Sequence, residues 1–187
     1  MDGSVLTTAE ANEIFASADC LYTEDEVDHA IGEMANNITS VMHDKMPVVL
    51  CTMIGGIVTA GKLLERLQFP LTIDYIHASR YRGAMVGADL HWIARPTESL
   101  KDRVVLIVDD IFDEGLTLEA LVKDCVEAGA SKVYSAILVE KQCPKKSTMK
   151  IDFTGLLVSD RYVFGSGMDY KGCLRNVAGI YALPETE

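Results

Sequence analysis

A run of apolar residues from Val104 to Val108 is the feature that most constrains how this chain can fold. Four of its five residues are β-branched and none is polar, which is typical of a strand covered on both faces. Other runs of strand length alternate with helical patterns, at Val48–Met53, Leu71–Ala78, Val133–Val139 and Phe153–Val158. This alternation predicts an α/β fold with a mainly parallel, doubly wound sheet flanked by helices.

Helix signals lie between these strands. Thr23 and Glu26 form a capping-box pattern, in which each side chain caps the backbone amide of the other residue. Apolar residues then recur at helical spacing as far as about His43. Two further helices are expected, one after the paired glycines that follow Met53 and one that begins at Thr117.

The length of 187 residues suits one domain with a sizeable buried core. We expect a single domain over residues 1–187, with a core over about 46–160. The two ends of the chain, about 1–25 and 155–187, are expected to build a small hood lobe together.

The charge balance restricts the partners. A net charge of −11 and a pI near 4.8 disfavour a broad basic surface for nucleic acid. No run of about 18 apolar residues suggests a membrane span, and the N-terminus does not resemble a secretory signal. The five scattered cysteines, with no CxxC pair, favour reduced thiols over disulfides or zinc. We therefore expect a cytoplasmic protein without membrane or nucleic-acid partners.

The segment after the central strand carries the strongest functional signal. Four carboxylates crowd into six residues from Asp109 to Glu114, and such crowding needs either a purpose or wide exposure to solvent. Gly115 permits close approach of the backbone, and Thr117 lies where the expected helix begins. A loop over 109–115 would offer oxygens to hydroxyls or a hydrated cation, and then amides to a phosphate. The alternative is an acidic turn with a capping threonine, and a function in sugar-phosphate binding is favoured over it.

Two other segments follow strands in the same way. Gly55 and Gly56 would let backbone amides approach a diphosphate, although a helix-starting turn explains them equally well. The segment from Val158 to Gly165, with Met168–Tyr170 and Arg175, would stack a flat heterocycle and face charged groups. A core aromatic cluster with a surface ion pair is an equal alternative for this segment.

Together these residues resemble a known family. The segment Val104–Thr117 resembles the phosphoribosyl-pyrophosphate binding motif of type I phosphoribosyltransferases: an apolar strand, two acids, two apolar residues, Asp, any residue, Gly, any residue and Thr. Leu138–Lys141, Asp160–Gly165 and Met168–Tyr170 with Arg175 resemble the bacterial hypoxanthine-guanine phosphoribosyltransferases. The resemblance covers the chain from about Cys20 to Ala182. It implies the type I phosphoribosyltransferase fold.

The resemblance implies an activity and a set of partners. The activity is the transfer of a 5-phosphoribosyl group from phosphoribosyl pyrophosphate to N9 of hypoxanthine or guanine, which gives IMP or GMP and pyrophosphate in purine salvage. It also implies Mg²⁺ as cofactor and assembly into a homodimer or homotetramer.

The roles of the acidic segment follow from the same resemblance. Asp109 and Asp110 would hold the ribose hydroxyls, directly or through the metal shell. Asp113 would lie near N7 of the purine and act there as the catalytic general acid and base. The 5′-phosphate would lie in a cradle of amides from Glu114, Gly115, Leu116 and Thr117.

Roles for the remaining segments are implied in the same way. Gly55 and Gly56 would receive pyrophosphate beside a Met53–Ile54 peptide that is typically cis. Lys141 would donate to the exocyclic O6 of the base. The other implied contacts are base stacking by Tyr162, backbone contacts to the base edge from Val163, a water-mediated metal contact from Asp169, pyrophosphate binding by Arg175 and a closing loop with Arg80 and Tyr81.

Four positions depart from the pattern of this family. Many relatives carry Lys in place of Ile54 and Ser in place of Arg80, and a hydroxyl residue and Lys are frequent in place of Glu114 and Leu116. Amide contacts do not depend on the side chain, so the departures affect the expected pyrophosphate affinity rather than the reaction.

Three alternatives compete with this activity. A nucleotide-sensing regulator on the same fold would keep the phosphate contacts but lose catalytic groups, whereas Asp113, Lys141, Asp169 and Arg175 are all present. A xanthine-preferring phosphoribosyltransferase would share all the phosphate chemistry. A Mg²⁺-dependent phosphatase would need a nucleophilic aspartate in a different motif.

Overall fold

The protein is built around a six-stranded sheet, which a computed structural model describes together with its surroundings over residues 6–79, 91–145 and 147–184. The strand order is β4-β3-β2-β5-β6-β7, and every neighbouring pair is parallel except β3 and β4. The strands are β2 (Val48–Thr52), β3 (Thr72–Ser79), β4 (His91–Ala94), β5 (Val104–Phe112), β6 (Lys132–Gln142) and β7 (Phe153–Ser159). The predicted α/β class is confirmed.

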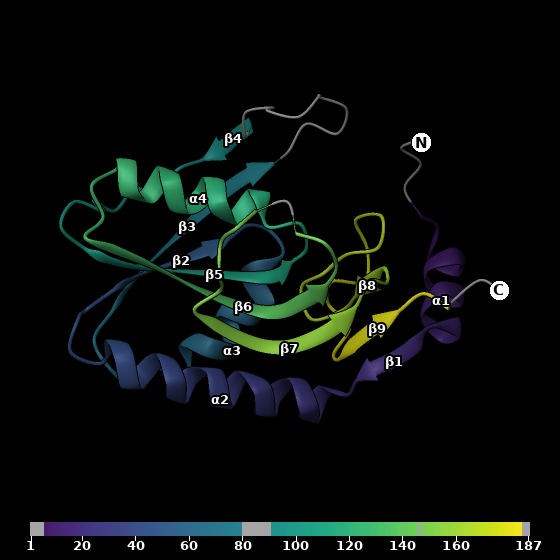
Figure 1. Ribbon diagram of the computed structural model, residues 1–187. Coiled ribbons are helices and arrows are strands. Elements are labelled where there is room, and N and C mark those ends of the chain that lie inside the picture. Colours follow the sequence, from purple (N-terminus) through teal and green to yellow (C-terminus); the bar gives the residue numbers. More distant parts are fainter. Residues whose placement is uncertain (1–5, 80–90, 146, 185–187) are drawn as a thin grey trace.

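Helices cover both faces of this sheet. Helices α2 (Glu24–Met42) and α3 (Gly56–Leu64) lie on one face, and α4 (Leu116–Glu127) lies on the other (Figure 1). Alternate residues of β5 enter the two cores: Leu106 and Val108 pack under α2 and α3, and Val105 and Ile107 pack under α4. The apolar run of β5 is therefore buried on both sides, as its sequence predicts.

The capping box before α2 is confirmed. The Thr23 hydroxyl accepts from the Glu26 amide, and the Glu26 carboxylate accepts from the Thr23 amide. The buried residues of α2 recur at helical spacing, as an amphipathic helix requires. Among the described residues, no helix combines the length and the hydropathy that crossing a membrane requires.

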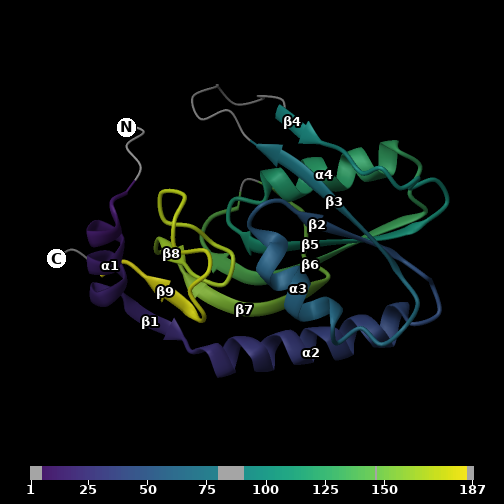
Figure 2. The ribbon, with the colours of Figure 1, turned by 180° about the vertical axis from the view of Figure 1, so that it is seen from behind.

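A second, three-stranded antiparallel sheet joins the two ends of the chain. Its order is β1-β9-β8, from β1 (Asp19–Tyr22), β8 (Val163–Phe164) and β9 (Ile180–Ala182). Helix α1 (Thr8–Ser17) packs beside it, where the Phe15 ring meets the Tyr181 ring edge-on at 5.0 Å. In both ribbon views this hood lies beyond the carboxyl ends of β5 and β6 (Figures 1 and 2). The hood therefore covers the edge of the large sheet at which open α/β folds bind ligands.

Several boundaries differ from those predicted. Strand β5 continues through Asp109 and Asp110 to Phe112, because these residues keep parallel pairing with β6 as far as Glu140. Strand β6 runs to Gln142, so it includes the lysine that was expected after its end. Helix α4 begins one residue before Thr117, at which it was expected to start. Helix α1 and strand β1 were not predicted.

Candidate active site

Two neighbouring acids, Asp109 and Asp110, form the centre of the site near the end of β5. The Thr52 hydroxyl at the end of β2 contacts the Asp109 carboxylate and lies 2.9 Å from the Val108 carbonyl oxygen. The Asp110 amide donates to the Asp109 carboxylate at 2.9 Å, and the Ile111 amide donates to that of Asp110 at 2.9 Å. These contacts fix both carboxylates at the carboxyl edge of the sheet.

Burial dominates the electrostatics of this pair. It raises the pKa of Asp109, against hydrogen bonds from Thr52 that lower it. Burial also raises the pKa of Asp110 well above its usual value, and the charge on Asp109 raises it further. Only 8% of Asp110 is exposed. Both carboxylates therefore favour a ligand that contributes positive charge or hydroxyl donors.

Arg175 supplies one cation to this pair. Its Nη1 lies 3.8 Å from Oδ2 of Asp110, and its Nη2 lies 2.6 Å from Oδ1 of Asp169. Nη1 also donates to the Gly167 carbonyl at 2.6 Å. Oδ2 of Asp169 accepts from the Gly172 amide at 2.7 Å, so both of its oxygens are already engaged. The segment between β8 and β9 thereby delivers Arg175 and Asp169 to the end of β5.

The turn after β2 packs tightly against the same pair. A Cβ atom on Gly55 would lie 2.1 Å from Oδ2 of Asp110, and one on Gly56 would lie 2.6 Å from Oγ1 of Thr52. The Met53–Ile54 peptide bond is cis, as the resemblance implies. These glycines are therefore needed for the approach of the backbone to the acidic centre.

The turn before α4 lines a cavity next to the acidic pair. Gly115 has a φ of 87° in the left-handed region, where a Cβ atom would meet the Phe112 ring at 2.6 Å. A cavity of about 340 Å³ is lined by residues 109–118 and so includes the first turn of α4. Free amides at a helix N-terminus and the helix dipole both favour an anion. The predicted phosphate cradle thus lies at a suitable position.

A second cavity of about 310 Å³ brings together the residues expected to face a base. It is lined by Asp110, Ile111, Asp113, Lys141, Tyr162, Val163, Met168 and Asp169. Nζ of Lys141 lies 3.4 Å from Oδ2 of Asp113, and the lysine side chain is 13% exposed. The Tyr162 ring is 48% exposed and packs edge-on against Tyr170 at 5.4 Å. A flat ring that enters here would meet the Lys141 cation, the carboxylates that line the cavity and an aromatic face.

A third cavity of about 400 Å³ lies at the turn after β2. It is lined by Gly55, Thr117 and Arg175, among others, and shares Asp110 and Ile111 with the other two cavities. Three neighbouring cavities thus share Asp110 and Ile111 as lining residues. One carries amides for an anion, one carries groups for a flat base, and one carries a guanidinium and a glycine turn.

The structure brings most of the predicted site residues to this edge. Arg80 and Tyr81 lie outside the described residues, and Gly56 and Thr117 lie in the first turns of α3 and α4. Thr52 and Ile111 also line the cavities, and the sequence predicted no role for either residue. Thr52 ends a buried strand next to β5, and that position was the available signal. Ile111 is apolar and carries no such signal, whereas Met168 lies in a segment that was expected to face a heterocycle.

The fold and the cavities define an α/β protein with a composite ligand site at the carboxyl edge of its sheet. Residues 17–171 match the family model described as "Phosphoribosyl transferase domain". The chain therefore belongs to the phosphoribosyl transferase family, and within it to the hypoxanthine-guanine phosphoribosyltransferase group.

Relatives of known name support this assignment. The chain is 32% identical over 167 residues to the hypoxanthine-guanine-xanthine phosphoribosyltransferase of Tritrichomonas foetus, over 89% of this chain and 91% of that relative. It is 29% identical over 164 residues to the hypoxanthine-guanine phosphoribosyltransferase of Bacillus subtilis, over 87% and 91% of the two chains.

Solved structures show the same fold. A hypoxanthine-guanine-xanthine phosphoribosyltransferase superposes with a TM-score of 0.80 at 30% identity, over 89% of this chain and 97% of the other. A hypoxanthine phosphoribosyltransferase from Staphylococcus aureus has a TM-score of 0.86 at 22% identity, over 96% and 97%. The second likeness concerns the fold alone.

Proposed function

We propose that the protein transfers a 5-phosphoribosyl group from phosphoribosyl pyrophosphate to N9 of hypoxanthine or guanine, as an enzyme of purine salvage. The observation that supports this most is the meeting of three cavities at Asp110 and Ile111. A ribose at that junction would direct its 5′-phosphate to α4, its pyrophosphate to the turn after β2 and its C1′ to the base cavity.

Ribose and phosphate binding follow from the polar groups of two cavities. Asp109 and Asp110 accept from the ribose hydroxyls, and the amides of Glu114–Thr117 bind the 5′-phosphate. Arg175 and the backbone of Gly55 and Gly56 hold the pyrophosphate, whose negative charge the guanidinium balances in part. These contacts bring the reacting atoms together and so lower the entropic part of the barrier.

Oxygen ligands for Mg²⁺ are present at the same place. The carboxylates of Asp109 and Asp110 provide the hard oxygen donors that Mg²⁺ prefers. Burial raises the pKa of both groups, so a bound cation would stabilise their ionised forms. Asp169 would act through water, because both of its oxygens already have partners. When bound, Mg²⁺ would neutralise charge on the leaving pyrophosphate.

Base recognition rests on the second cavity. Lys141 donates to O6 of a 6-oxopurine. Adenine has an amino group at that position, which is itself a donor and could not accept from Lys141. Asp113 exchanges a proton at N7 as N9 attacks C1′, and Tyr162 stacks on the ring. The backbone of Val163 meets the base edge. The mechanism therefore needs both Lys141 and Asp113 in reach of one bound base.

Steady-state kinetics with phosphoribosyl pyrophosphate, Mg²⁺ and each of hypoxanthine, guanine, xanthine and adenine test the proposal. We expect turnover with hypoxanthine and guanine, and turnover with adenine lower by about 100-fold or more. Lys141→Ala should reduce this preference by at least about tenfold, because it removes the donor to O6. Unchanged adenine discrimination in that variant would remove Lys141 from base recognition. Failure to turn over any of the bases would favour a nucleotide-sensing regulator on the same fold.

Xanthine is a second candidate base. The relative from Tritrichomonas foetus carries xanthine in its name, and Lys141 would also suit a 6-oxo group on xanthine. The same kinetic experiment ranks xanthine against hypoxanthine and guanine by kcat/KM. A cytoplasmic location remains an expectation.

We also infer that the chain assembles with a second copy of itself. The outer face of β3 exposes Ile73 and Tyr75, and Ile57 of α3 lies exposed beside them. They line a cavity of about 460 Å³ between α3 and β3, and the other residues that line it are Cys51, Met53, Ala60, Gly61, Leu64 and Asp74. An apolar surface of this kind on a soluble enzyme is typical of a protein interface. It supports a homodimer or homotetramer, as the family resemblance implies.

A further inference from the structure

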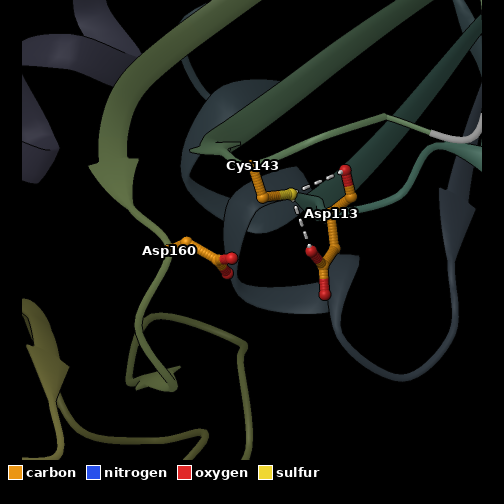
Figure 3. Close-up of side chains that lie close together, drawn as sticks. All are labelled: Asp113, Cys143 and Asp160. Carbon is orange, nitrogen blue, oxygen red and sulfur yellow. Dashed lines mark hydrogen bonds between the residues drawn. The ribbon is translucent and has the colours of Figure 1, made fainter.

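Three side chains next to the base cavity come from corresponding places in the fold. Asp113, Cys143 and Asp160 are each the first residue after one of the neighbouring parallel strands β5, β6 and β7. Because parallel strands end at the same edge of a sheet, these side chains meet (Figure 3). Their ligand-type atoms all lie within 4.8 Å of one another.

The thiol of this cluster makes a specific contact with the acid. Sγ of Cys143 lies 3.2 Å from Oδ1 of Asp113 and 3.6 Å from its carbonyl oxygen (Figure 3). On the other side of the carboxylate, Nζ of Lys141 lies 3.4 Å from Oδ2. Each carboxylate oxygen of Asp113 therefore has its own donor, and the two donors together restrain the orientation of the carboxylate.

Cations around the cluster favour a hydrogen bond over a bound metal ion. Nζ of Lys141 also lies 3.6 Å from Oδ1 of Asp160, and Nζ of Lys145 lies 3.7 Å from Sγ of Cys143. Two ammonium groups this close would repel a divalent cation. The cluster therefore resembles a network of donors and acceptors in which the carboxylates are already paired.

The protonation of the thiol agrees with its role as donor. Burial raises the pKa of the Cys143 thiol, and its hydrogen bond to Asp113 raises it further, although Lys145 opposes them. The group therefore remains S–H near neutral pH, and a thiol in that form donates to a carboxylate.

The backbone around Cys143 is fixed as well. Its amide donates to the Lys141 carbonyl at 3.0 Å, and Pro144 restricts the backbone of Cys143, the residue before it. Nζ of Lys145 donates to the Asp113 carbonyl at 2.9 Å, which ties the two loops together. The thiol is thus held against Asp113 by the fold, whereas half of the Asp113 side chain is exposed and has few other restraints.

We propose that Cys143 is a positioning residue, whose thiol holds the Asp113 carboxylate in the orientation from which it exchanges a proton with the bound base. The proposal rests on the function proposed above for Asp113. It adds a donor that acts on the acid without contacting the substrate. A site in which only Lys141 held Asp113 would lose that restraint whenever Lys141 turned to the base.

Kinetics of two variants test the role. Cys143→Ala removes the donor and should lower kcat about three- to tenfold, with the KM for phosphoribosyl pyrophosphate within about twofold of wild type. Cys143→Ser keeps a donor and should recover most of the lost kcat. Cys20→Ala, an exposed cysteine in β1, is the matched control and should leave kcat unchanged.

Two kinetic outcomes would overturn the proposal. One is a wild-type kcat in Cys143→Ala, and the other is an equal loss in the Ala and Ser variants, which would indicate packing rather than donation. Zn²⁺ inhibition of the wild type that Cys143→Ala abolishes, together with an unchanged kcat in Mg²⁺ alone, would instead assign the cluster to metal binding.

A second measurement needs no enzymatic turnover and so separates this proposal from the proposed function. Asp113→Asn removes the negative charge beside the thiol, and Cys143 should then be alkylated severalfold faster by iodoacetamide at neutral pH. Peptide mass spectrometry resolves Cys143 from the other four cysteines. An alkylation rate equal to that of the wild type would exclude the contact, whether or not the protein turns over any base.

Discussion

The two acids near the end of β5 destabilise the ligand-free protein, because two buried carboxyl groups lie side by side. Asp109 and Asp110 are adjacent in sequence, burial raises the pKa of both, and Arg175 approaches Asp110 only to 3.8 Å. A site optimised for stability would not keep two such groups side by side. The arrangement is explained by a ligand whose hydroxyls or metal ion stabilise the charged forms, as strained functional sites commonly require.

Asp110→Asn should therefore stabilise the ligand-free protein at neutral pH while it abolishes turnover. When folding raises the pKa of a carboxyl group, the native state holds a proton at pH values at which the same group is already ionised in the unfolded chain. The free energy of unfolding then falls as pH rises from the unfolded pKa, near 3.9, through the raised folded pKa.

The expected gain for Asp110→Asn is about 2–4 °C in Tm at pH 7–8, which corresponds to roughly 1 kcal/mol. It should shrink as the pH falls towards the unfolded pKa, because the wild-type carboxyl then becomes neutral too. Thermal unfolding at several pH values measures both effects. A variant less stable than wild type at every pH would contradict the account.

Asp113 differs from this pair because its side chain is half-exposed and already contacts Lys141. Asp113→Asn should lower kcat by about 100-fold or more, since proton transfer by a positioned group contributes that much to catalysis. Binding of phosphoribosyl pyrophosphate should change little, because its phosphate contacts lie elsewhere. Kinetics and equilibrium binding measure the two quantities, with the exposed Glu33→Gln on α2 as control. An unchanged kcat would reject the role of Asp113.

At the scale of elements, two glycines of the α3 region, the N-cap Gly55 and Gly61 inside the helix, have opposite surroundings. A Cβ atom at Gly55, the N-cap, would overlap the Asp110 carboxylate, whereas a Cβ atom at Gly61 inside the helix would meet no atom within 4 Å. Gly55→Ala should therefore displace the acidic pair, with a loss of activity and of about 2 kcal/mol or more of stability. Gly61→Ala should raise stability by about 0.4–1 kcal/mol and leave kcat unchanged. Chemical denaturation compares them, and equal effects would contradict this explanation.

The elements that the sequence predicted well are those with strong local patterns. The capping box of α2 and the apolar runs of β2 and β5 fix their elements locally, so the predicted class, strands and helix start agree with the structure. The end of β5 was not predictable in this way. Asp109 and Asp110 are poor strand residues by composition, and pairing with β6 keeps them in the ladder.

The same distinction between local and non-local information applies to the site residues. Charged residues and glycines that follow strands, such as Asp113 and Gly115, can be predicted from the local sequence. Thr52 and Cys143 do not, because a hydroxyl or a thiol at a strand end gains significance only when a neighbouring strand brings an acid beside it. That information is held in the strand order, which the local sequence does not specify.

At the scale of the whole molecule, the hood depends on contacts between the two ends of the chain. Arg161 contacts the Asp19 carboxylate and the Leu183 carbonyl, and the Tyr22 hydroxyl donates to the Leu157 carbonyl at 2.7 Å. The hood therefore joins β1, β7 and β9 across long sequence separations. Segments near both ends position the loop that carries Asp169 and Arg175, which explains why the site needs nearly the full length of the chain.

The assembly proposed above concerns a surface of β3. The exposed fractions of Ile73 and Tyr75 are 58% and 44%, and on the same face of the sheet α2 and α3 pack against β2, β5, β6 and β7. This leaves the outer face of β3 as the apolar surface that a second copy would cover. A charge at its centre would have to be desolvated on association, which is unfavourable without a partner.

Ile73→Glu should therefore dissociate the assembly at micromolar concentration, as measured by sedimentation velocity. Val126→Glu is the matched control, because Val126 is equally apolar and 56% exposed but lies on α4, on the opposite face of the sheet. It should leave the mass of the assembly unchanged. A monomeric wild type, or dissociation by both variants alike, would refute the assignment of this surface. Because the cavity beside Ile73 includes Met53, whose peptide leads into the glycine turn of the site, dissociation should also weaken pyrophosphate binding.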